Sequence, residues 1–455
     1  MKQTFNFTIA YIALFLMLCS GCKKFLEVKP DKKLVPPSTF SDLEAILNGD
    51  FIMNSAYPVG GELGCDNFYL TQADWNSLTD IPSKQFYIWD GAYPNERDWK
   101  NGYDQVFNAN VVLDNIEKIR KTSENEARWG QVKGTALFFR SHSYYYLAQI
   151  FSEQYDSLLA NNRLGIPLKL IADINTPTVR STLKVTYQQI FNDLVEAAKL
   201  LPPIRTYKTQ PCKAACFAQL ARVLLAMGNY HRAFLYADSC LQVTNTLIDY
   251  NTINAGSALP FSIFNSEVIF HCTLQTGNSL APARCKGDTL LYKSYKPDDL
   301  RRVIFFRQNT NGSYAFKGSY SGANNSSLFG GIATDEVYLI RAECNARIGN
   351  LNAALADLNT LMQKRWKNGL FAPFTATSPG EALLLILNER RKELCFRADL
   401  RWFDLRRLNR QPGFETTLTR TIGNQVYTLP PNDKRYVFLI PQSVIDLTGI
   451  PQNER

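Results

Sequence analysis

Histidine is scarce in this sequence, and the motifs of several enzyme classes are missing. Its 455 residues include only three histidines, His142, His231 and His271, far apart in the chain. Few histidines are therefore available as ligands for a multi-histidine metal site, and no HExxH pair is present. There is no glycine-rich phosphate loop before a Lys-Ser or Lys-Thr pair, and no GxSxG nucleophile elbow. These absences predict a protein with no metal site, no cofactor and no catalytic residues.

Neither sign of charge dominates the chain. Lys and Arg number 50 against 41 Asp and Glu, a formal net charge of +9 that is spread along the sequence. This pattern excludes a nucleic-acid arm and a polybasic membrane patch. Beyond residue 22 no segment is apolar for the roughly 20 residues that a membrane-spanning helix needs. An apolar content of 45% is nevertheless enough for a sizeable core.

The N-terminus has the pattern of an export signal. Lys2 precedes an apolar run over residues 9–19, and the small pair Ser20-Gly21 leads directly to Cys22. This ending resembles a bacterial lipobox, although Cys19 stands where a leucine is usual. The alternatives are a plain secretory signal and an N-terminal anchor helix.

Three segments follow from that reading. Residues 1–21 are a predicted lipoprotein signal peptide, and Cys22 is the predicted lipidation site. Residues 22–37, which end at Pro36-Pro37, are a predicted lipidated tether. Residues 38–455 form one predicted body, which the lipid holds at the membrane.

Helical patterns dominate this body. Residues 214–241 carry two apolar stripes at spacings of three and four, separated by Gly228-Asn229, and residues 336–365 repeat the arrangement around Gly349-Asn350. Such pairs resemble tetratricopeptide units, but they do not recur every 34 residues. We predict a mainly α fold, with tetratricopeptide-like helix pairs in one large body, long irregular loops and a few short strands.

Two stretches interrupt the helical period. Residues 58–98 combine Gly, Pro and polar residues with seven interleaved aromatics, and we expect long loops there. Residues 243–333 hold further polar loops around two expected short strands, at 267–271 and 302–306. Long loops in a compact domain are usually functional, so we expect ligand-binding loops near 58–98 and 243–333.

Eight cysteines remain after Cys22. Cys212 and Cys216 lie one helical turn apart with no histidine in a ligand spacing, so we expect small thiols in a helical core. Disulfides do form in exported proteins, and Cys272 with Cys285 is the first disulfide pair to test.

A charged cluster near the C-terminus is typical of a structural ion network. Glu389 and Glu393 share one helical face, and Arg401 is expected to pair with Asp404 while Trp402 and Phe403 pack. The motif residues within the C-terminal region 334–455 are Glu389, Arg390, Glu393, Arg401, Trp402, Asp404 and Arg406.

The order of these motifs resembles the SusD/RagB nutrient-uptake outer-membrane lipoproteins of Bacteroidetes over nearly the whole chain. The most specific part is Glu389-Arg390-Arg391 with Glu393-Leu394 and Phe396, followed by the run from Arg401 to Arg407. Weaker agreement includes Cys22 with Phe25-Leu26-Glu27, Trp99, Tyr103, Asn110, Arg140, Ile440-Pro441 and Pro451-Gln452-Asn453. Arg397-Ala398 departs from the Glu-Gly that the family usually has there, and Lys23-Lys24 replace the acidic residues that often follow the lipidated cysteine.

The resemblance implies a non-catalytic lipoprotein on the cell outer membrane, exposed at the surface. Such a protein binds glycan fragments or peptides and hands them to a SusC-like TonB-dependent transporter. Sugar rings stack on aromatic side chains, and amides and carboxylates bind hydroxyls. The expected ligand contacts are Tyr69, Trp75, Trp89 and Tyr320 for stacking, and Asp66, Asn67 and Asn324 for hydrogen bonds.

Other interpretations stay open at this point. These aromatics could simply anchor long loops. The chain could also be a periplasmic tetratricopeptide-like scaffold that binds only protein. Chance acid pairs such as Asp298-Asp299, or Asp66 with Asp74, leave an exported glycoside hydrolase as a weaker alternative.

Overall fold

The computed structural model describes residues 37–90, 95–275, 277, 279–322 and 327–455. The chain divides into two units, Met1–Pro37 and Ser38–Arg455. The predicted signal peptide, Cys22 and almost all of the predicted tether therefore lie outside the described residues. Within those residues, no helix has the length and apolar character needed to cross a membrane.

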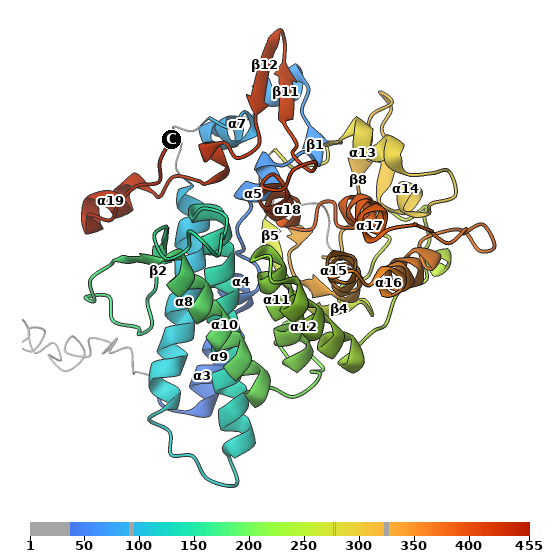
Figure 1. Cartoon of the computed structure of the whole chain (residues 1–455). Helices are drawn as coiled ribbons and strands as arrows, with labels where there is room; N and C mark the ends of the chain where they lie inside the picture. The colour runs from blue at the N-terminus through green and yellow to red at the C-terminus, as the bar shows by residue number, and fades with distance from the viewer. Residues whose placement is uncertain (1–36, 91–94, 276, 278, 323–326) are drawn as a thin grey trace, which may run out of the picture. The chain divides into compact units, whose positions relative to one another are not determined.

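A series of long helices, each packed on the next, forms the framework of Ser38–Arg455 (Figure 1). This confirms the mainly α prediction with tetratricopeptide-like pairs. The helices are α8 (Glu96–Ile116), α9 (Glu126–Phe151), α10 (Leu183–Leu200), α11 (Lys213–Ala226), α12 (Tyr230–Val243), α15 (Thr334–Arg347), α16 (Leu351–Gln363) and α17 (Pro379–Glu393). Shorter helices are α3 (Phe40–Leu47), α4 (Asp50–Met53), α13 (Thr289–Ser294), α18 (Leu400–Leu408) and α19 (Gln442–Thr448).

The two predicted Gly-Asn turns separate the helices as expected. Gly228 and Gly349 have φ values of 73° and 90°, a left-handed conformation that glycine adopts without steric penalty. Asn229 then caps α12 by accepting a hydrogen bond from the Arg232 amide at 3.3 Å. Each turn thus ends one helix and starts its partner.

In the described part of the chain, the strands form six separate antiparallel pairs rather than one sheet. They are β1 (Phe68–Tyr69) with β6 (Lys286–Gly287), β2 (Leu164–Pro167) with β3 (Arg180–Thr182), β4 (Val268–Phe270) with β10 (Ile332–Ala333), β5 (Thr273–Gln275) with β9 (Ser327–Phe329), β7 (Phe306–Gln308) with β8 (Tyr314–Phe316), and β11 (Leu418–Ile422) with β12 (Gln425–Leu429). The first predicted strand is confirmed by β4.

The second predicted strand, at 302–306, is wrong over most of its length. Residues Arg301–Ile304 form the short helix α14, and β7 begins only at Phe306. A short apolar run does not distinguish a strand from a buried helical turn. Here the helical turn carries the Arg301 side chain into a buried group of carboxylates.

The stretch 58–98 is also more regular than expected. It contains β1 and three short helices, α5 (Gly60–Gly64), α6 (Gln72–Asn76) and α7 (Ile81–Tyr87). Thr71 caps α6 by accepting the Asp74 amide at 3.1 Å, and Asp80 caps α7 through the Ser83 amide at 3.0 Å. Helices of one or two turns are too short to show a period, so the sequence did not reveal them.

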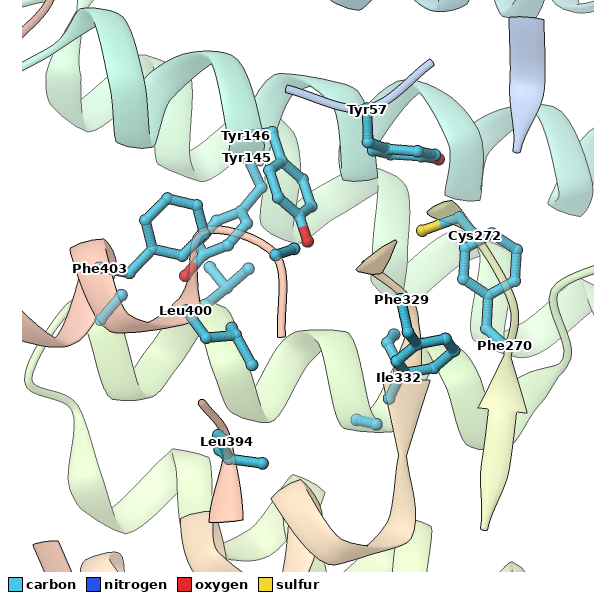
Figure 2. Packing of buried hydrophobic residues seen from close by; sticks show 14 of the residues in the cluster. Tyr57, Tyr145, Tyr146, Phe270, Cys272, Phe329, Ile332, Leu394, Leu400 and Phe403 are labelled. Carbon is cyan, nitrogen blue, oxygen red and sulfur yellow. The ribbon is translucent and has the colours of Figure 1, made fainter. Parts of the chain in front are cut away.

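Much of the aromatic surplus lies in the core. Tyr145, Tyr146 and Phe403 gather from α9 and α18, and Tyr57 packs edge-on to Tyr146 at 5.5 Å between ring centroids (Figure 2). The eight cysteines after Cys22 are all free and buried, including Cys272 and Cys285. The structure therefore supports small core thiols and does not form the disulfide considered first.

Candidate functional site

The two stretches expected to bind ligand meet at one strand pair. Strand β1 pairs with β6, so that Phe68 lies opposite Gly287 and Tyr69 opposite Lys286. Strand β6 in turn packs beside β8. Segments more than 200 residues apart in the sequence are thereby joined into one region around β6.

Four partly exposed aromatic side chains surround β6. We call Tyr69, Trp75, Tyr292 and Tyr314 the β6 aromatic cluster; they come from β1, α6, α13 and β8. The Tyr292 and Tyr314 rings are stacked, with centroids 3.5 Å apart and planes at 17°. Partly exposed rings on short elements offer flat apolar surfaces at fixed positions.

Polar groups hold this cluster in place. Lys286 Nζ lies 2.6 Å from Asp74 Oδ2, which ties β6 to α6. Burial opposes ionisation of Asp74, but Lys286 and Thr71 outweigh it and lower the pKa of the carboxyl. Trp75 donates its Nε1–H to the Lys84 carbonyl at 3.3 Å, and the Lys84 ammonium lies 5.1 Å from the ring centroid.

Asp66 and Asn67 lie beside this cluster, but their polar groups are already hydrogen-bonded to other side chains of the protein. Arg401 donates two hydrogen bonds to the Asp66 carboxylate, at 2.7 and 2.8 Å. Burial opposes ionisation of Asp66, yet Arg391 and Arg401 hold its pKa well below the usual range. Asn67 is fully buried, donates to Glu62 at 2.7 Å and accepts from Arg391 at 2.5 Å. Both residues therefore fix the backbone that leads into β1.

Trp89 and Tyr320 lie in the core rather than on a surface. Trp89 is 5% exposed and donates to the Gly64 carbonyl at 2.8 Å. Tyr320 is 0% exposed, and its hydroxyl donates to Glu267 at 2.5 Å. Asn324 lies outside the described residues. Of the stacking residues expected from sequence, the structure leaves Tyr69 and Trp75 partly open to solvent.

Tyr292 and Tyr314 were not among the expected contacts. Both stand in the polar stretch 243–333, as Tyr320 does, so residue type and loop setting did not separate them. Strand alternation does not separate them either, because Phe316, two residues after Tyr314 and on the same face of β8, is buried while Tyr314 is partly exposed.

Two of the C-terminal motif residues, Glu389 and Glu393, belong to a buried ion-pair network. Arg301 contacts Asp299, Glu389 and Glu393, and Arg365 contacts Glu393 and Glu267, at N–O distances between 2.5 and 3.0 Å. All six side chains are at most 5% exposed. We call these six residues the Glu393 network.

A second buried group follows on α18. Arg390 and Arg407 both bind Asp404, each at 2.8 Å, and Trp402 is fully buried beside them. The expected pair of Arg401 with Asp404 is therefore wrong, because Arg401 turns to Asp66 and two other arginines take Asp404.

The departure at Arg397-Ala398 has a local explanation. Arg397 pairs with the buried Asp335 at 2.7 Å and stacks on the Tyr320 ring, 3.7 Å from its centroid. Burial raises the pKa of Asp335 to about 7 even though Arg397 opposes the shift. Ala398 has a φ of 49°, in the left-handed region that favours glycine. The turn is thus kept although its glycine is absent.

Helix α5 is surrounded by buried carboxyl groups. Asp399 accepts the Glu62 amide at 2.8 Å, and Asp98 accepts the Gly60 amide at 2.8 Å. Burial raises the pKa of Glu62 to about 8, and the Oε2 atom of Glu62 has no hydrogen-bond partner. In the part of the chain that the structure describes, no three His, Cys, Asp or Glu side chains are arranged to hold a metal ion.

Comparison with known proteins agrees with this architecture. Residues 24–225 match the family described as starch-binding and associating with the outer membrane, and residues 298–449 match the SusD family. Two curated relatives from Formosa agariphila are SusD-like protein P2, 27% identical over 241 residues, and SusD-like protein P25, 25% identical over 168 residues. These alignments cover 50% and 32% of this chain, but only 44% and 30% of the relatives' own lengths.

Solved structures share the fold over almost the whole chain. A Bacteroides vulgatus protein named for sugar binding has a TM-score of 0.76 at 20% identity, covering 92% of this chain and 99% of its own. A SusD superfamily protein from Bacteroides thetaiotaomicron has a TM-score of 0.73 at 22% identity, covering 92% and 100%. The two family matches, the relatives and the shared fold agree: the chain belongs to the SusD/RagB family.

Proposed function

We propose that this protein is a non-catalytic lipoprotein of the outer membrane that binds oligosaccharides, or alternatively peptides, at the β6 aromatic cluster. The observation that carries the proposal is the gathering of Tyr69, Trp75, Tyr292 and Tyr314, partly exposed, on elements from both expected stretches. Family membership and the names of the relatives support a carbohydrate as the first ligand to test.

Delivery to a transporter completes the proposal. Lipidation at Cys22 would hold the protein on the outer membrane, exposed at the cell surface, where it passes ligand to a SusC-like TonB-dependent transporter. Replacing Cys22 by Ser should release the protein from membranes, and protease added to intact cells should digest the wild type. Survival of the protein in shaved cells would contradict surface exposure. Co-purification with such a transporter tests the partnership.

Ligand binding is tested by a glycan array probed with the protein lacking residues 1–22. Trp75→Ala and Tyr69→Ala should each weaken the best oligosaccharide about tenfold, because each ring loses roughly 1–2 kcal/mol of apolar contact. Tyr207→Ala is the matched control, since Tyr207 is 69% exposed and lies outside the cluster. Equal binding by all variants would refute the cluster as the site, and release of shortened products from the bound glycan would refute a non-catalytic role.

A further inference from the structure

A polar pocket of about 540 Å³ lies apart from the β6 aromatic cluster. Its walls are formed by residues 153–154, 162–164, 406, 409–410, 432–434, 436–437 and 451–454, together with Arg180 on β3. None of the four cluster aromatics lines it. A pocket of this volume is typical of small-molecule sites.

Two arginines of this pocket differ from most buried arginines of the protein. Ten arginines are buried in the described part of the chain. Seven of them bind a carboxylate: Arg140, Arg222, Arg301, Arg365, Arg390, Arg397 and Arg407. Arg420 has no carboxylate but is covered by aromatic rings and lies outside the pocket. The other two, Arg180 and Arg406, line the pocket.

Both guanidinium groups keep unused hydrogen-bond donors. Arg180 donates three hydrogen bonds, all to backbone carbonyls. Arg406 donates two, to the Ser152 carbonyl and to the Gln149 side chain. Because a guanidinium has five N–H groups, two remain on Arg180 (5 − 3) and three on Arg406 (5 − 2). Because both residues line the pocket, an acceptor from outside the chain fits against these donors.

Helix α9 explains part of this arrangement. Its C-terminal carbonyls, from Phe151 and Ser152, accept hydrogen bonds from Arg180 and Arg406 respectively. A helix end carries only about half a negative charge, which does not balance two full positive charges. Consistent with that imbalance, burial lowers the pKa of each guanidinium to about 10. Arg222, whose partner is Glu336, instead has a pKa raised above its usual range, even though burial opposes the rise.

The remaining charges at the pocket are already paired. Arg163 binds Glu153, Arg410 binds Asp156, Lys434 binds Glu454, and Asp433 binds Arg435. A neutral acceptor is also available, because Gln154 is 9% exposed and its Oε1 has no hydrogen-bond partner. The pocket therefore combines two uncompensated cations with an acceptor suited to a hydroxyl group.

We propose that this pocket binds the acidic group of an anionic sugar, a carboxylate or a sulfate ester, through Arg180 and Arg406. Gln154 accepts a hydrogen bond from a sugar hydroxyl. The oxyanion supplies the counter-charge that the chain itself does not provide. That the oxyanion belongs to a sugar rests on the proposed function, whereas the anion site rests on the pocket alone.

Calorimetric titration of the purified protein at constant ionic strength tests this site. The probes are D-glucuronate, D-glucose 6-sulfate and, as the neutral match, D-glucose. Both anions should bind saturably and D-glucose at least tenfold more weakly. Arg180→Gln and Arg406→Gln should each weaken anion binding about tenfold or more, because a charge-assisted hydrogen-bond donor is lost. The preferred anion distinguishes a uronic acid from a sulfated sugar.

Controls separate binding from folding. Arg420→Gln removes an equally buried arginine outside the pocket and should leave anion affinity unchanged. Asn162→Trp fills the pocket mouth from an exposed turn, so it should abolish binding without unfolding the protein. Absence of saturable binding, equal binding of D-glucose, or wild-type affinity in Asn162→Trp would each overturn the proposal. Trp75→Ala should not alter D-glucuronate binding, so failure of one site is distinguishable from failure of the other.

Discussion

In the Glu393 network, two guanidinium groups and four carboxylates are closed off from solvent, whereas around β6 four aromatic rings remain partly open to it. The network contains Glu389 and Glu393 from the most recognisable part of the sequence, and the aromatic cluster contains unremarkable residues. The recognisable motif residues therefore maintain the fold, and they also position the segment that carries the β6 aromatic cluster. Two arginines connect the two regions. Just before β1, Arg391 donates hydrogen bonds to Asn67 and to the Asp66 carbonyl, and Arg401 donates to the Asp66 carboxylate.

The largest expected effect comes from breaking the Glu393 network. Glu393→Gln leaves Arg301 and Arg365 buried with less counter-charge, so the free energy of unfolding should fall by about 3–5 kcal/mol. Urea unfolding followed by circular dichroism measures it. Glu381→Gln, at the exposed start of the same helix, should change stability by less than about 1 kcal/mol. A similar small change in Glu393→Gln would mean that the network does not stabilise the fold.

Glu62 should make stability depend on pH. Burial raises the pKa of this carboxyl from its ordinary value of 4.5 to about 8 in the folded protein, so the folded state binds the proton more tightly. The stabilisation is complete below pH 4.5 and is lost as pH rises towards 8, with a slope of up to about 1.4 kcal/mol per pH unit. Unfolding of Glu62→Gln between pH 5 and 8 should show a flatter dependence. The exposed Glu117→Gln is the control, and an unchanged slope in Glu62→Gln would contradict the assignment.

Tyr320 tests which aromatics serve the fold. Tyr320→Phe removes a buried hydroxyl that bonds Glu267 and Tyr250, so stability should fall by about 1–3 kcal/mol. Glycan binding should be unaffected, in contrast to Trp75→Ala. Tyr207→Phe, on the surface, should change neither quantity. Loss of glycan binding in a folded Tyr320→Phe variant would return this residue to the ligand site.

The smallest effect is expected at Ala398. Because its φ is 49°, Ala398→Gly relieves backbone strain and should raise the free energy of unfolding by about 0.5 kcal/mol after the loss of a buried methyl group. Ala346→Gly, within α15, is the matched change in a right-handed helix. It should lower the free energy of unfolding by about 1 kcal/mol. Destabilisation of both variants by the same amount would show that the turn at Ala398 is unstrained.

The helical framework could be predicted because its signals are local. The Gly-Asn turns at Gly228 and Gly349 mark helix ends directly, and the stripes around them define buried faces. The short helices α5 to α7 could not, because one or two turns carry no period. The run at 302–306 was ambiguous for the same reason.

The residues of the proposed ligand region were harder to predict than the framework. The two stretches expected to bind ligand do meet in the structure, because β1 pairs with β6. Individual residues were not resolved by sequence, because burial separates Tyr320 from Tyr314 while their local sequences look alike. Which guanidinium meets which carboxylate, as for Arg401 with Asp66, depends on contacts between segments 335 residues apart.

That separation has a consequence for how the chain reaches its folded state. Three of the side chains that anchor β1 and the segment before it, Arg391, Arg401 and Arg420, lie more than 300 positions later in the chain. Contacts of such long range form slowly, since the intervening chain must first be brought together. During synthesis, which starts at the N-terminus, the segment before β1 therefore lacks these three anchors until residues 391–420 have been made. Truncation near the C-terminus should then abolish ligand binding even where the early helices still form.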